Sequence, residues 1–169
     1  MFYPNPNQFK DSELLNDEVL KRWGSGGKRL LCPLMLISLQ QLRNRFGRMV
    51  LLNSGLQQRV LRTSAYFIKQ VAKGNVSRGL QLYADSYSMH KYGKAADATM
   101  LDTPLEKVHE YIFNHPDEFP FIHFIETDVD WLHFDVRNQP DITFWSAKTE
   151  KTVRVAKQLP IDWSKIVNI

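Results

Sequence analysis

The chain has 169 residues, of which 43% are hydrophobic and 24% are charged, so one folded domain is expected and wholesale disorder is excluded. Its single cysteine, Cys32, excludes an internal disulfide and a four-cysteine zinc site. The charge is uneven, because residues 1–80 hold 13 Lys+Arg against 4 Asp+Glu, whereas acidic residues outnumber basic ones in residues 81–169. The basic half could meet a polyanion, and the acidic half, which holds all the histidines, is the better place for a metal.

The first thirty residues are expected to be a peripheral segment, followed by one domain over residues 31–169. Residues 11–22 are typical of a short amphipathic helix whose inward side chains are Leu14, Leu15 and Val19. Residues 24–28, GSGGK, indicate a flexible connector that links this helix to the main domain.

The next stretch begins with a helix, because Pro33 suits a first helical turn and Gly47 suits a helix end. Apolar residues between them recur at steps of four, three and four, and predict one buried stripe of Met35, Leu39, Leu42 and Phe46. Residues 49–55 predict a short buried strand and residues 56–73 a helix. Residues 74–94, rich in Gly, Ser and Tyr, indicate a long irregular loop.

The second half predicts mainly strands, beginning with residues 95–100. A capping-box pattern at Thr103–Glu106, with proline at the first helical position, predicts a helix to about Asn114. Further strands are expected over residues 121–126, 131–137, 142–147 and 152–156. Within residues 131–137 one face would hold Leu132, Phe134 and Val136, and the other Trp131, His133, Asp135 and Arg137. Helices precede strands, so the class is α+β, with N-terminal helices and a small antiparallel sheet.

Two histidines and one aspartate have the character of metal ligands. His90 lies in a short segment that also holds Gly93 and Asp97, and His133 lies on a predicted strand that projects its imidazole from one face. Two His and one Asp form a three-ligand set with a fourth position for water, the arrangement of a catalytic zinc. Oxygen and nitrogen ligands without thiolate keep the metal a good Lewis acid.

The pattern Ser88-x-His90-x-x-Gly93-x-Ala95-x-Asp97, followed by Asp130-x-x-His133, resembles the D-Ala-D-Ala metallopeptidase family of zinc enzymes. This family contains D-alanyl-D-alanine carboxypeptidases, dipeptidases and phage endolysins that cut peptidoglycan stem peptides. The resemblance covers about residues 34–137, including the segments 38–55, 62–66 and 131–137. It implies the fold of the D-Ala-D-Ala peptidase or Hedgehog-like type.

The resemblance also implies roles for individual residues. Zn²⁺ would be held by His90, Asp97 and His133. Asp130 matches the catalytic acid/base, and Glu126 occupies a place where some family members carry a glutamate, so it is the second candidate.

Arg62 matches the arginine that polarises the scissile carbonyl or anchors a carboxylate. Relative to the family pattern, six extra residues, 56–61, precede Arg62, so Arg59 competes for this role. Ser88 would support the site by hydrogen bonding. Trp131 is a candidate substrate platform or a wall of the strand core.

The function expected from these features is a zinc metallopeptidase that cleaves peptidoglycan stem peptides or cross-links, of the carboxypeptidase or phage endolysin type. The longest nearly apolar run is ten residues, half of a membrane span, and no secretory signal is evident. We therefore expect a monomer without a transmembrane segment, made in the cytoplasm and acting on the cell wall or in a virion.

Two alternatives to the peptidase remain open at this point. One is a non-enzymatic wall-binding or virion component with a peptidase-like fold. The other is a nucleic-acid-binding protein that uses the basic half. No helix-turn-helix or RNA-recognition signature supports the second alternative, so no nucleic-acid partner is expected.

Overall fold

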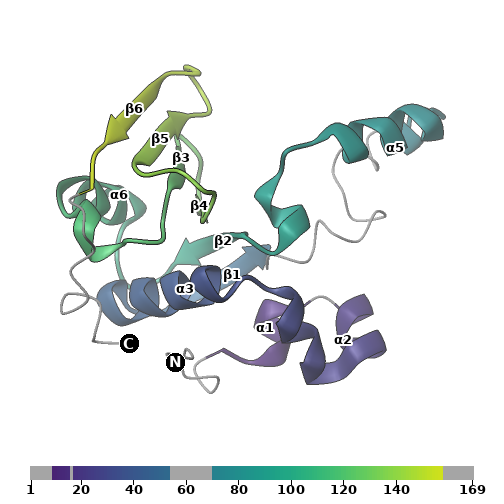
Figure 1. The fold of residues 1–169 in the computed structure, drawn as a ribbon, viewed down its shortest axis with the longest axis horizontal. Coiled ribbons are helices and arrows are strands. Elements are labelled where there is room, and N and C mark those ends of the chain that lie inside the picture. Colours follow the sequence, from purple (N-terminus) through teal and green to yellow (C-terminus); the bar gives the residue numbers. More distant parts are fainter. Residues whose placement is uncertain (1–8, 16, 54–69, 158–169) are drawn as a thin grey trace.

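The computed structural model of this protein describes residues 9–15, 17–53 and 70–157. Its centre is a six-stranded sheet with the strand order β1-β2-β4-β3-β5-β6 (Figure 1). The strands are β1 Met49–Asn53, β2 Ala95–Met100, β3 Phe124–Thr127, β4 Leu132–Asp135, β5 Ile142–Ser146 and β6 Thr152–Val155. Neighbouring strands are antiparallel except β3 and β5, which run parallel. The α+β class is confirmed, and the expectation of a wholly antiparallel sheet is wrong at this one pair.

The helices of the described residues lie mostly in the first two thirds of the chain. Their bounds are α1 Asp11–Leu14, α2 Asp17–Trp23, η1 Gly24–Leu30, α3 Pro33–Phe46, α5 Val76–Asp85, η4 Met89–Tyr92, α6 Leu105–Asn114 and η5 Pro116–Glu118, where η marks a 3-10 helix. In Figure 1, α3 runs alongside β1 and β2, while α5 extends away from the sheet. No helix among the described residues is long and apolar enough to span a membrane.

One hydrophobic core joins helices and sheet. The predicted stripe on α3 is confirmed, since its four residues are at most 6% exposed: Met35, Leu39, Leu42 and Phe46. They share a cluster with Val108 and Ile112 of α6 and with the inward residues of the strands. Leu14, Leu15 and Val19 are buried in the same cluster. The expected division into a peripheral segment over residues 1–30 and a domain over residues 31–169 stays a prediction. Several of the described residues before residue 31 pack into the same core as the rest.

Several local expectations differ from the structure. The single helix predicted over residues 11–22 is two short helices, and the GSGGK connector belongs to η1. The predicted loop at 74–94 contains α5, where the Asn75 side chain accepts a hydrogen bond from the backbone N–H of Arg78. Thr103 does not cap α6, because its hydroxyl donates to the carbonyl of Phe46. Most of the predicted helix at 56–73 lies outside the described residues.

Candidate metal centre

Strands β2 and β4 lie side by side and place two of the predicted ligands opposite each other. Asp97 pairs with His133 in the antiparallel register. Their strand neighbours, Ala96 and Ala98 on β2 and Leu132 and Phe134 on β4, are fully buried. Because side chains alternate along a strand, Asp97 and His133 project together from the other face of the sheet.

The third ligand comes from η4, immediately before β2. His90 is only 3% exposed, and the chain turns back toward the sheet at Gly93, whose φ is +63°. A Cβ at Gly93 would lie 2.6 Å from the carbonyl oxygen of Leu30, and the Gly93 carbonyl accepts a hydrogen bond from the Cys32 N–H at 2.9 Å. The turn therefore requires glycine, both for its left-handed backbone and for the close approach of residues 30–32.

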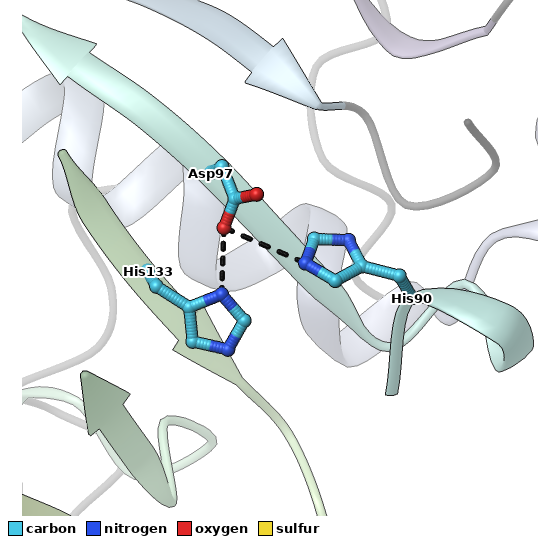
Figure 2. Close-up of side chains that lie close together, drawn as sticks. All are labelled: His90, Asp97 and His133. Atoms are coloured by element: carbon cyan, nitrogen blue, oxygen red, sulfur yellow. Dashed lines mark hydrogen bonds and ion pairs between the residues drawn. The ribbon is translucent and has the colours of Figure 1, made fainter. Parts of the chain in front are cut away.

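The three side chains converge on one point. Figure 2 shows both imidazoles pointing toward the Asp97 carboxylate. Nδ1 of His133 lies 2.6 Å from Oδ1 of Asp97, and Nε2 of His90 lies 3.4 Å from the same oxygen. All three ligand atoms fall within 4.8 Å of one another. The predicted grouping of His90, Asp97 and His133 is confirmed in space, and this group could hold a metal ion.

The ionised state of the Asp97 carboxylate favours cation binding. Burial raises the pKa of this carboxyl, but hydrogen bonds with His133 and then His90 outweigh burial and hold the pKa below the ordinary aspartate value. The carboxylate is therefore ionised at neutral pH and presents a negative charge between two imidazoles. A buried carboxylate with two neutral nitrogen donors is a donor set that zinc accepts.

One ligand-atom distance fits a zinc ion, and a second would have to change. A tetrahedral ion with bonds of about 2.0–2.1 Å separates its ligand atoms by roughly 3.3 Å. The His90–Asp97 separation of 3.4 Å already has this value. The shorter His133–Asp97 hydrogen bond would have to lengthen by roughly 0.7 Å, a change within the reach of two side-chain torsions.

The two candidate bases occupy different places. Glu126 on β3 pairs with His133 in the register and is partly buried, so its side chain leaves the sheet on the same face as the metal group. Asp130 is exposed in the turn between β3 and β4. The row across the sheet is thus Asp97, His133, Glu126 and then Trp145 of β5.

Of the remaining predicted site residues, the structure describes Ser88 and Trp131 but not the two arginines. Arg62 and its competitor Arg59 lie outside the described residues. Ser88 directly precedes η4 and is partly buried, and its carbonyl accepts a hydrogen bond from the Lys91 N–H at 3.1 Å. Trp131, also partly buried, directly precedes β4, two residues before His133.

Two residues near His133 carried no role in the sequence-based prediction. The ring of Phe124 meets the His133 imidazole edge-on at 5.9 Å, and the guanidinium of Arg137 lies 3.9 Å from the centroid of the Phe124 ring. Strand alternation could have identified both residues from the sequence, because Phe124 shares a face with Glu126. Arg137 shares a face with His133 in the same way.

Comparison with known proteins adds no assignment, because the chain matches no protein-family model, no curated protein and no solved structure.

Proposed function

We propose that this chain is a zinc-dependent peptidase that hydrolyses peptide bonds in peptidoglycan stem peptides or their cross-links, as phage endolysins and wall carboxypeptidases do. The observation that supports the proposal best is the convergence of His90, Asp97 and His133 within 4.8 Å from three separate elements. These are the positions of the motif that resembles the D-Ala-D-Ala metallopeptidases. Chance proximity of two histidines and an ionised aspartate at motif spacing is a poor explanation of that agreement.

The residues of the chain have distinct tasks in this proposal. His90, Asp97 and His133 hold the ion, which when bound supplies a Lewis acid and lowers the pKa of a coordinated water. A carboxylate beside the ion takes a proton from the attacking water and returns it to the leaving amine. The face of the sheet where Asp97, His133 and Glu126 lie receives the peptide.

Two carboxylates compete for the proton transfer, and each has its own support. The resemblance names Asp130, three residues before the last histidine ligand. The register favours Glu126, because directly opposed residues on antiparallel strands have Cβ atoms about 4.5–5.5 Å apart. Glu126 therefore lies beside His133 whatever the conformation of the exposed turn that carries Asp130.

The decisive experiment measures zinc and wall digestion on one preparation. Untagged protein should contain about one equivalent of zinc, and zinc-loaded protein should release fragments from purified peptidoglycan whose masses identify the bond that is cut. His90→Ala and His133→Ala should lose both the metal and the activity. His115→Ala is the matched control, because His115 is exposed and lies outside the metal group.

Three results would contradict this function. Full zinc retention in both ligand variants would remove the metal assignment. Wall digestion that survives loss of zinc would remove the metal-dependent mechanism. Zinc-loaded protein that pellets with the wall but releases no fragments would favour a wall-binding component instead.

A further inference from the structure

Arg137 is held rigidly by a buried carboxylate on the metal-bearing face of the sheet. Asp135, two residues earlier, is 1% exposed. Arg137 donates to it from the backbone N–H at 3.1 Å, from Nε at 2.8 Å, and from Nη2. A guanidinium fixed on one edge by two parallel hydrogen bonds loses little further entropy when it binds a second partner.

The guanidinium also lies next to the metal group. It stacks on Phe124 at 3.9 Å, and the same ring contacts His133 edge-on at 5.9 Å. One aromatic ring therefore separates the cation from a metal ligand. The Phe124 ring also stacks on Trp145 of β5, the strand that flanks β3 on the side away from β4.

Part of this cation remains available for a ligand. The Arg137 side chain is 35% exposed, although its partner is buried. Asp135 occupies Nε and one proton of Nη2, and no described residue accepts a hydrogen bond from Nη1. A guanidinium has five N–H donors, so its outer edge keeps a second parallel pair of donors for a planar anion.

We infer that Arg137 is a substrate-binding residue that pairs with a free carboxylate of the peptide, next to the bond positioned at the metal group. This inference rests on the proposed peptidase function and narrows its substrate class to peptides with a carboxylate near the scissile bond. The carboxylate is either the C-terminal one or that of an acidic side chain. A residue that served only to neutralise Asp135 would give no preference between a carboxylate and its amide.

The test compares peptides that differ in one group. Synthetic stem peptides with free carboxylates, with a C-terminal carboxamide, and with a side-chain carboxamide are offered to zinc-loaded protein for hydrolysis and to metal-free protein for calorimetric binding. Arg137→Gln should raise KM and weaken binding for the free peptide by roughly 10- to 100-fold, with a smaller change in kcat. For the peptide that carries an amide in place of the recognised carboxylate, binding and KM should be the same in Arg137→Gln as in the unchanged protein.

Two variants control the interpretation. Arg154→Gln removes the same charge from the same face of the sheet, because Arg154 of β6 pairs with Thr143 and Thr143 pairs with Phe124. Two strands, β3 and β5, lie between β6 and β4. Arg154→Gln should leave the preference intact. Arg137→Gln leaves the buried Asp135 carboxylate without its partner, which costs folding stability. The double variant Asp135→Asn/Arg137→Gln repeats the measurement without an unpaired buried charge.

The outcomes separate this inference from the proposed function. Equal losses for free and amidated peptides in Arg137→Gln and in the double variant would overturn the role of Arg137 while leaving the peptidase in place. A carboxylate preference in binding that depends on Arg137, without any hydrolysis, would support the site and overturn the peptidase. Absence of both binding and hydrolysis for every peptide would overturn both.

Discussion

Replacing Gly93 with alanine should test whether the turn that carries His90 sets the geometry of the metal group. Gly93 has φ +63°, and an added Cβ would lie 2.6 Å from the Leu30 carbonyl oxygen and 3.1 Å from the Leu31 Cα. Both atoms belong to the backbone, so a side-chain rotation cannot relieve the overlap. Gly74 is a matched control, since its φ is +73° but an added Cβ would meet nothing within 4 Å.

The difference between the two substitutions isolates the steric overlap from the backbone strain. A non-glycine residue in the left-handed region costs about 1–2 kcal/mol, and this is the whole expected loss for Gly74→Ala. Gly93→Ala adds the displacement of packed backbone, at about 1–3 kcal/mol, for a total of roughly 2–5 kcal/mol. Because η4 must move away from residues 30–31, the His90–Asp97 distance should change as well.

Urea unfolding of the metal-free proteins measures the stability loss, and competition with a chromophoric chelator measures zinc affinity. Gly93→Ala should lower zinc affinity by roughly 10- to 100-fold, the range seen when groups that orient a metal ligand are lost. Gly74→Ala should leave it unchanged. Equal stability losses at the two positions, or full zinc affinity in Gly93→Ala, would refute the reasoning.

Three further predictions concern the base, the pH dependence and the metal. Asp130→Asn and Glu126→Gln should both keep zinc, and only the variant that removes the base should lose hydrolysis, by roughly 10²-fold or more. Undiminished hydrolysis in both variants would exclude both residues as the base. Burial and then the nearby charge of Lys157 lower the pKa of His123 to about 4, so the unfolded chain, with a pKa of 6.5, takes up the proton first. The free energy of unfolding should therefore fall as the pH drops from about 6.5 to 4. The fall should be roughly 1–2 kcal/mol, because this imidazole is half exposed and solvent screens its charge. Urea titrations at both pH values should show a smaller change in stability with pH in His123→Gln. Free zinc at 100 times its Kd should stabilise the native protein by about 2.7 kcal/mol in thermal melts, and Asp97→Asn should not respond.

The elements that the sequence predicts well are those whose periodic apolar residues face one core. The α3 stripe and the alternation in β4 each place several residues against the same cluster, and both are confirmed. The metal group follows from this, because the polar members of two correctly predicted strands must share the opposite face. His90 lies outside these strands, and its place beside them also depends on the left-handed turn at Gly93.

Segments held by individual polar contacts are where prediction from the sequence fails. The helix α5 was missed because its composition of Gly, Ser and Tyr is typical of loops. The structure stabilises its ends with the Asn75 cap and with Lys91, whose ammonium donates to the carbonyls of Tyr83, Ala84 and Ser86. Neither contact has a periodic signal. The parallel pairing of β3 with β5 is likewise a long-range choice that local alternation does not encode.

The register of the sheet ties the position of Glu126, one of the two candidate bases, to the packing of the core. Ile125 on β3 pairs with Phe134 on β4, and both are fully buried. A slip of one residue between these strands would turn Ile125 toward the face that holds His133 and carry Glu126 into the core. The apolar pair therefore fixes Glu126 beside His133, while the exposed turn places no such constraint on Asp130. Glu126→Gln should therefore keep zinc and the fold under either assignment, and it should lose hydrolysis only if Glu126, rather than Asp130, is the base.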